Sequence, residues 1–182
     1  MWPICKWRPF KSWFNRDGGE VFPESPSSQP RTAELDQALH AVGFEFDLLS
    51  PQKLTGHLTV TEICCQPFKV LHGGVTAMIA EGVASMGAYI ASGFQRVAGV
   101  QLSTNHIRAA LLGDRILVEA VPIHKGRTIQ VWEVQLLKIV PSASGDNKTM
   151  LLSTSRITLL SNLPSSMDVK SFEDTVKKYA KL

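Results

Sequence analysis

The sequence contains little cysteine: only Cys5, Cys64 and Cys65 are present among 182 residues. An odd, sparse set with two adjacent members is poorly suited to a disulfide framework, so the chain is not built like a small secreted protein. Cys64 and Cys65 fit two small residues at the end of a strand better than they fit a redox pair. We therefore expect the protein to reside in a reducing compartment.

Strong net charge is also missing. The formal net charge is only +3, and the central region has no concentrated basic stripe, which argues against a nucleic-acid-binding protein. No long apolar run of the kind found in secretory signals follows the basic N-terminus. Hydrophobic residues make up 44% of the chain and charged residues 19%, a balance typical of a soluble globular domain with its own core.

Charge is almost absent between Lys69 and Arg96, where Glu81 is the one formally charged side chain. The segment 75–93 is long enough to span a bilayer. Its central glutamate, three glycines and many small or hydroxyl-bearing residues favour a buried helix over a membrane span. A lone carboxylate in such a helix is costly unless it has a partner or a chemical task. Glu81 is therefore the first candidate functional residue.

Residues 1–32 differ in composition from the rest of the chain. They hold five of the ten prolines and three of the four tryptophans, a proline density incompatible with a continuous helix or a central strand. Their opening, MWPICKWRPFKSWF, interleaves aromatic and basic side chains, as a segment lying on a membrane surface or a partner would. A poorly ordered extension is the simpler interpretation. We therefore divide the chain into an N-terminal extension (1–32), a globular domain (33–163) and a tail (164–182).

The residue pattern becomes regular from Thr32 onward. Apolar spacing predicts a helix over 32–42 capped by Thr32, and a long helix over about 75–92. Strand-like runs occupy 44–50, 54–63, 97–107, 115–123, 128–140 and 150–160. The tail places apolar residues at 169, 172, 176 and 179, which predicts a short amphipathic helix. One long apolar helix and six strands favour an α+β fold, with a curved antiparallel sheet of about six strands wrapped around the helix.

The motif HGG at 72–74 stands directly before the long helix. Glycine lets the backbone approach a ligand closely, and free N–H groups at a helix N-terminus stabilise an oxygen that gains negative charge. Glu81 lies two turns further along, Ser85 lies one turn beyond it, and Gln66 precedes the motif. Together they outline an oxyanion hole beside a carboxylate. A structural alternative also fits: the glycines form a turn, His72 caps the helix or lies in the core, and Glu81 pairs with a distant cation.

Over residues 39–163 the chain resembles the hotdog-fold acyl-CoA thioesterases, in which an antiparallel sheet wraps a long helix. HGG at 72–74, AE at 80–81 and the upstream Gln66 are similar to the 4-hydroxybenzoyl-CoA thioesterase branch of that family. The chain resembles the plant 1,4-dihydroxy-2-naphthoyl-CoA thioesterases more closely still. The segments that carry this resemblance are GFEFDLLSP, CCQPFKVLHGG, ASGFQRVAGVQLSTNHI, TIQVWEV and the terminal AKL. The resemblance implies hydrolysis of 1,4-dihydroxy-2-naphthoyl-CoA to the free acid and CoA, a step towards phylloquinone, without a cofactor.

The resemblance also implies roles for individual residues. Glu81 would either attack the thioester carbonyl or activate a water molecule, and both routes stay open. The Gly73 N–H would polarise the carbonyl, and Gln66 would orient the carbonyl or the water. His72 would shape the loop, and Ser85 would hold the water or a substrate hydroxyl.

The turn HKGRT at 124–128 is a candidate site for the phosphates of coenzyme A. The expected substrate- and CoA-binding residues are Gly74, Lys125, Gly126, Arg127 and Thr128. A plain solvated hairpin turn explains this segment equally well. The five histidines lack metal-ligand spacing, so no metal site is expected; they are His40, His57, His72, His106 and His124.

In this family Glu81 of one subunit would face Gly73 of its neighbour, which implies a homodimer or homotetramer with a shared active site. The ending Ala180-Lys181-Leu182 resembles the peroxisomal S-K-L signal and predicts a peroxisomal enzyme that the import receptor recognises. An accidental ending on a cytoplasmic enzyme is the alternative. Two other functions remain open: thioesterase activity on another aryl- or fatty acyl-CoA, and non-catalytic acyl-CoA binding.

Overall fold

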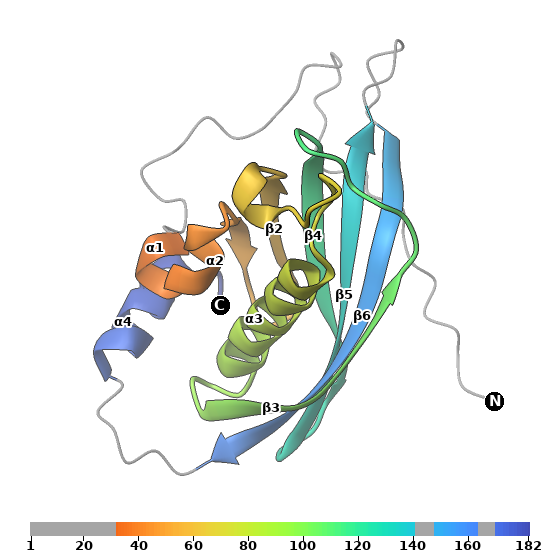
Figure 1. The fold of residues 1–182 in the computed structure, drawn as a ribbon. Coiled ribbons are helices and arrows are strands. Elements are labelled where there is room, and N and C mark those ends of the chain that lie inside the picture. The colour runs from red at the N-terminus through yellow and green to blue at the C-terminus, as the bar shows by residue number, and fades with distance from the viewer. Residues whose placement is uncertain (1–31, 141–147, 164–169) are drawn as a thin grey trace, which may run out of the picture.

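The structure is a computed structural model that describes residues 32–140, 148–163 and 170–182 (Figure 1). The predicted extension lies outside the described residues, apart from Thr32. The helices are α1 (Thr32–Leu35), α2 (Gln37–Ala41), α3 (Gly73–Ala91) and α4 (Lys170–Tyr179), with a 3₁₀ turn η1 (Glu62–Cys64). The strands are β1 (Glu45–Leu49), β2 (Leu54–Thr59), β3 (Arg96–His106), β4 (Arg115–Lys125), β5 (Ile129–Val140) and β6 (Lys148–Leu163).

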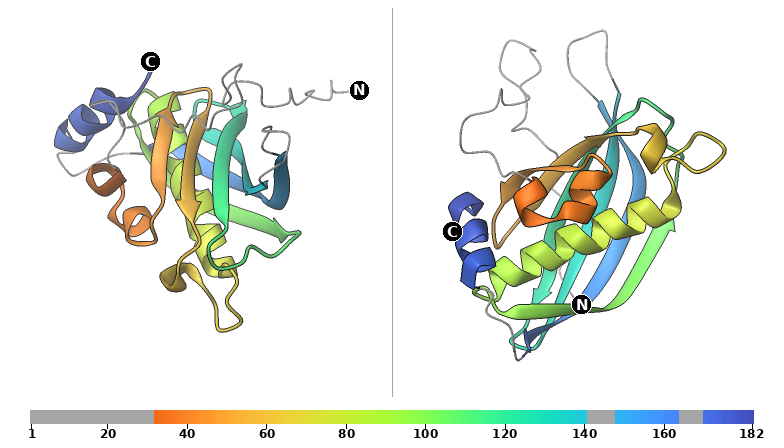
Figure 2. Two further views of the ribbon diagram at one scale, coloured as in Figure 1. Left: turned by 90° about the horizontal axis from the view of Figure 1, so that it is seen from above. Right: turned by 60° about the vertical axis from the view of Figure 1, so that its left-hand side comes forward.

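The six strands form one antiparallel sheet in the order β1-β2-β4-β5-β6-β3. The sheet curves around α3, which lies along its concave face (Figures 1 and 2). The predicted α+β fold is therefore confirmed, although α3 begins at Gly73, two residues earlier than expected. After α3 the chain enters β3, which pairs with β6 and not with β4, so β3 becomes an edge of the sheet.

The core lies between α3 and the sheet, and a pair of buried polar bonds fixes their relative position. Trp132 of β5 is fully buried and donates its Nε1–H to Gln130 Oε1 at 3.1 Å. Gln130 in turn donates from Nε2 to the carbonyl of Ala88 in α3, also at 3.1 Å. A buried amide is costly without partners, and here both of its ends are paired. The last turns of α3 are thereby held against β5.

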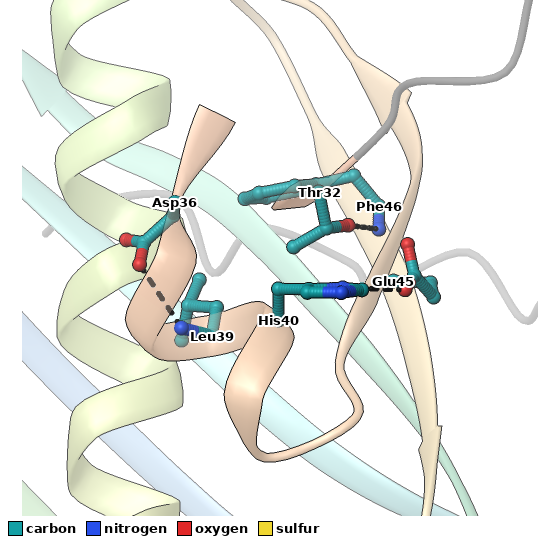
Figure 3. Close-up of polar contacts among 6 residues, drawn as sticks. All are labelled: Thr32, Asp36, Leu39, His40, Glu45 and Phe46. Atoms are coloured by element: carbon teal, nitrogen blue, oxygen red, sulfur yellow. Dashed lines mark hydrogen bonds and ion pairs between the residues drawn. The ribbon is translucent and has the colours of Figure 1, made fainter. Parts of the chain in front are cut away.

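The segment before β1 is two short helices, so the prediction of one helix over 32–42 is wrong (Figure 3). Asp36 interrupts the run and caps α2, because its side chain accepts a hydrogen bond from the Leu39 N–H at 3.0 Å. The predicted capping role of Thr32 is replaced by a tertiary contact. Thr32 Oγ1 accepts from the Phe46 N–H at 2.9 Å and ties α1 to β1.

The tail forms α4, as the apolar spacing predicts, and it packs against the domain (Figure 2). Val176 and Tyr179 are buried, and the Tyr179 hydroxyl donates to Glu34 Oε2 at 2.8 Å. Beyond the helix, the Lys181 N–H donates to the carbonyl of Leu49 in β1 at 2.8 Å. The C-terminus is therefore attached to the domain at two separate points.

Among the described helices, α3 alone is long and apolar enough to cross a bilayer. In the fold, 56% of its most apolar window is buried. Its apolar surface is therefore largely occupied by contacts with the protein's own sheet and neighbouring helices.

Candidate active site

Two cavities border α3, and each contains part of the predicted site. The larger, called here the Glu81 cavity, has a volume of about 760 Å³. It lies between α3, the α1–α2 segment, β3 and α4, and most of its wall is apolar. The polar side chains on its wall are Asp36, Glu81, Ser85, Tyr89 and Arg96.

Glu81 is exposed in the single chain, so the expected burial of this carboxylate in the helix is not observed. Its side chain lies over the edge strand β3 at Gly99. A Cβ atom built on Gly99 would lie only 2.5 Å from Glu81 Oε1. The carboxylate therefore occupies space that any other residue at position 99 would fill, and it faces the free edge of the sheet.

The smaller cavity, called here the Gly73 cavity, has a volume of about 340 Å³. Gln66, Gly73 and His106 line it, together with Ser153 of β6. The predicted oxyanion-hole residues thus come together, and Glu81 and Ser85 come together, but in two different cavities of one chain.

The start of α3 is organised by His72. Its Nδ1 accepts a hydrogen bond from the Gly74 N–H at 2.8 Å, and its carbonyl accepts from the Thr76 N–H at 3.1 Å. Within the described part of the chain the Gly73 N–H donates to no protein acceptor. His72 is therefore the N-cap residue, the Gly74 N–H is occupied by that cap, and the Gly73 N–H remains for a ligand at the positive end of the helix dipole.

The side chain of Gln66 has one end fixed. Its Oε1 accepts a hydrogen bond from the Phe68 N–H at 3.0 Å, in the turn before α3. The amide NH₂ group at the other end is thereby oriented as a donor. Gln66 and Gly73 together offer two N–H donors in the same cavity.

The spacing along α3 separates the carboxylate from this donor pair. Glu81 is eight residues beyond Gly73 on the same helix, which corresponds to roughly 12 Å of rise. A catalytic base and an oxyanion donor must both reach one carbonyl group, within ordinary hydrogen-bond distances. Glu81 and Gly73 of one chain are too far apart along the helix to do so.

Comparison of the sequence and fold with known proteins identifies the family of this chain. Residues 68–139 match the thioesterase superfamily. The chain is 54% identical over 151 residues to the 1,4-dihydroxy-2-naphthoyl-CoA thioesterase 2 of Arabidopsis thaliana, covering 82% of this chain and 96% of that protein. This chain belongs to the thioesterase superfamily.

Two further relatives support this membership. The 1,4-dihydroxy-2-naphthoyl-CoA hydrolase of Escherichia coli is 32% identical over 121 residues, which is 64% of this thioesterase and 82% of the bacterial protein. The crystal structure of AziG from S. sahachiroi superimposes with a TM-score of 0.62 and 30% sequence identity. That match covers 70% of this thioesterase and 97% of AziG.

Sequence reasoning missed one residue of the candidate site, His106 at the end of β3, which lines the Gly73 cavity. Its imidazole lies beside Gly73, because a Cβ built on that glycine would be 3.3 Å from both Cε1 and Nε2 of the ring. The distance of 33 residues between Gly73 and His106 in the sequence hides this contact. Only the return of β3 along the sheet to the start of α3 brings the two together.

The predicted phosphate-binding turn borders neither of the two cavities. Lys125, Arg127 and Thr128 are exposed between β4 and β5. The Gly126 N–H, expected to be free, donates to the carbonyl of Ile129 at 2.9 Å. It closes the hairpin instead of offering a donor, so only the side chains and the Thr128 N–H remain candidates for a phosphate contact.

No group of three or more histidine, cysteine, aspartate or glutamate side chains in the described residues is placed to hold a metal ion. The histidines make other contacts. His57 Nδ1 lies 2.8 Å from Asp47 Oδ1, and His40 Nδ1 lies 3.1 Å from Glu45 Oε1 (Figure 3).

The contact between Gly99 and Glu81 yields a testable prediction. We expect Gly99→Ala to lower kcat by about 10- to 100-fold, because the new methyl group displaces the carboxylate and a misplacement near 1 Å has an effect of this size. The unfolding midpoint should change little, because Gly99 is exposed and its neighbour is the flexible end of a side chain. Thiol release and thermal unfolding measure the two quantities. An unchanged kcat would show that Glu81 need not lie against β3.

Proposed function

We propose that this thioesterase hydrolyses 1,4-dihydroxy-2-naphthoyl-CoA to 1,4-dihydroxy-2-naphthoate and coenzyme A, a step towards phylloquinone. The observation that carries the proposal is the carboxylate of Glu81 on the wall of a mostly apolar cavity of about 760 Å³. A cavity of this size and character suits an aromatic acyl group. Relatives from Arabidopsis, Escherichia coli and Listeria monocytogenes carry this substrate in their names.

The chemistry follows from the side chains present. Glu81 either attacks the thioester carbonyl, giving an acyl-enzyme anhydride that water then cleaves, or removes a proton from water as that water attacks. In both routes the carbon–sulfur bond breaks, the acyl carbon gains a hydroxyl from water, and the sulfur leaves with a proton as the CoA thiol. The N–H groups of Gly73 and Gln66 stabilise the negative charge that develops on the carbonyl oxygen. Ser85, one turn beyond Glu81, holds the water or a substrate hydroxyl.

The active site is shared between two subunits of a homodimer, alone or within a homotetramer. Glu81 and Gly73 of one chain line separate cavities and lie roughly 12 Å apart along the helix, so neither cavity contains a complete site. The edge strand β3, eleven residues long, carries Gly99 beside Glu81 and His106 beside Gly73. A second copy paired along β3 in a two-fold arrangement sets the Glu81 of each chain against the Gly73 of the other.

A panel of acyl-CoA thioesters tests the substrate. We expect the highest kcat/KM with 1,4-dihydroxy-2-naphthoyl-CoA, lower values with benzoyl-CoA and the lowest with fatty acyl-CoAs, because a long flexible chain matches the cavity less well. Thiol release measures each rate. A faster rate with a fatty acyl-CoA would assign the enzyme to another substrate. Tight binding without any thiol release would indicate a non-catalytic acyl-CoA-binding protein.

The C-terminus supports a peroxisomal location. The side chains of Lys181 and Leu182 are exposed, with Leu182 at 78%, so an import receptor can reach them on the folded protein. A fluorescent protein fused to the N-terminus of the full chain should enter peroxisomes, and deletion of Leu182 should leave the fusion in the cytosol. Unchanged peroxisomal import after the deletion would show that the import signal lies elsewhere in the chain.

A further inference from the structure

The wall of the Glu81 cavity includes a residue of the C-terminal helix α4. Phe172 lines this cavity together with residues of α1, α2, α3 and β3. Its side chain packs against the core but is only partly buried, so the remaining ring surface is available to a ligand in the cavity. The family match covers residues 68–139, so α4 contributes to the wall from outside the matched segment. The proposed mechanism gives Phe172 no role.

Phe172 is held beside the C-terminal end of α3 (Figure 2). Its ring centroid lies 5.5 Å from that of Tyr89, whose side chain also lines the cavity. One turn further along α4, Val176 is fully buried, and after it Tyr179 donates its hydroxyl to Glu34 at 2.8 Å. These contacts hold α4 against the domain. Phe172 therefore presents an aromatic surface whose position is fixed before a ligand binds.

The distance along α3 indicates which part of an acyl group meets Phe172. Tyr89, its aromatic neighbour, is eight residues beyond Glu81, a rise of roughly 12 Å. Tyr89 and Phe172 are the two aromatic side chains on the cavity wall, so an aromatic acyl group finds its stacking partners at this end. An acyl group with its thioester carbonyl at Glu81 then points its far end at Phe172. A benzoyl group, one ring shorter than a naphthoyl group, ends before Phe172, whereas an extended palmitoyl chain is too long.

We propose that Phe172 is a specificity-determining residue that packs against the distal ring of the bound naphthoyl group and limits the length of the acyl group. This assignment rests on the proposed function, because it requires an aromatic acyl group in the Glu81 cavity. Two aromatic rings attract each other beyond the area that they bury, and a side chain at the end of a pocket excludes longer ligands by steric overlap. Phe172 therefore favours a bicyclic aryl thioester over both shorter and longer ones.

The test compares Phe172→Ala with the wild type on 1,4-dihydroxy-2-naphthoyl-CoA, benzoyl-CoA and palmitoyl-CoA, with thiol release as the measurement. We expect kcat/KM to fall about tenfold on the naphthoyl thioester, because the contact between the two rings is lost. The value for benzoyl-CoA should stay within about twofold of the wild type, because its single ring does not touch Phe172. The value for palmitoyl-CoA should rise about tenfold, because the far end of the cavity is opened.

Val176→Ala provides a matched control on the same helix. Val176 is fully buried and lines neither of the two cavities, so its truncation weakens the packing of α4 without changing the cavity wall. The ratios among the three kcat/KM values should therefore stay as in the wild type. Phe172→Leu, which keeps an apolar side chain against Tyr89 but removes the ring, should change the ratios in the same direction as Phe172→Ala by a smaller factor.

Three results would overturn the assignment. They are equal losses of Phe172→Ala on the naphthoyl and benzoyl thioesters, no loss on either, and the same change of the ratios in Val176→Ala. The first and third would show that α4 supports the site as a whole, and the second that Phe172 does not touch the acyl group. A wild-type enzyme that releases no thiol from the naphthoyl thioester overturns the proposed function instead, so the two failures are distinguishable.

Discussion

Glu81→Gln lowers kcat for thioester hydrolysis by roughly two to four orders of magnitude, the range expected when a general base is removed. The amide keeps the size and shape of the carboxylate but cannot attack a carbonyl or accept a proton from water. Substrate affinity should change much less, because the mostly apolar cavity wall and the oxyanion donors remain. Thiol release measures kcat, and calorimetric titration with a non-hydrolysable thioether analogue measures binding.

The matched control for this substitution is Glu62→Gln. Glu62 is also exposed and lies in η1, where it pairs with Lys69 and lines neither of the two cavities. Its neutralisation removes one negative charge from the same subunit and should leave kcat within about twofold of the wild type, because a solvent-exposed ion pair contributes little. Full activity of Glu81→Gln would assign the base to another group. Equal losses in both variants would indicate a general charge effect.

The sequence contains enough information to predict the central helix and the surrounding sheet, because both depend on local patterns. The long apolar stretch around Glu81, which carries no other charge, predicts the helix. The alternation of apolar and polar residues predicts the strands. The HGG motif marks the start of α3 to within two residues, since glycine and a capping side chain are local signals. Local signals therefore predict a helix start with free N–H groups at the HGG motif, whereas the separate roles expected for His72 and Gly73 come from the resemblance to the thioesterases.

Tertiary contacts account for what the sequence cannot predict. Asp36 caps α2, whereas the Thr32 side chain accepts a hydrogen bond from the N–H of Phe46, fourteen residues beyond Thr32 (Figure 3). The sequence around Thr32 does not reveal this distant partner. The contact of Glu81 with Gly99 and that of Gly73 with His106 both depend on where β3 joins the sheet. Apolar spacing treats Glu81 as a buried residue, whereas the edge position of β3 leaves its carboxylate open.

Gly73→Pro should remove the oxyanion donor while keeping the helix. Gly73 is the first residue of α3, a position where proline is favoured and its missing N–H breaks no intrahelical bond. His72 already has φ −68° and ψ 130°, the extended conformation that a residue before proline requires. We expect kcat to fall by about 10²- to 10³-fold, as for loss of one oxyanion-hole donor. Gly73→Ala, which keeps the N–H beside His106, should retain more activity.

Mixing the two inactive variants then tests whether the site is shared. In a heterodimer of Glu81→Gln and Gly73→Pro subunits, one of the two interfacial sites combines an intact Glu81 with an intact Gly73. Random co-assembly at equal amounts should therefore restore about a quarter of the wild-type rate in a two-fold dimer. If each site lay within one chain, every site would carry one defect and the mixture would stay inactive.

A second mixture, which contains wild-type chains and chains that carry both substitutions, also distinguishes shared sites from sites within one chain. In this mixture shared sites give the lower rate. Wild-type chains co-assembled with equal amounts of Glu81→Gln/Gly73→Pro chains should show about a quarter of the full rate if the sites are shared, because both sites of the heterodimer are defective. Sites within one chain would give about half, since each wild-type subunit would keep its activity. A recovered quarter in the first mixture and a quarter in the second are together compatible only with Glu81 acting on a carbonyl held by the partner's Gly73.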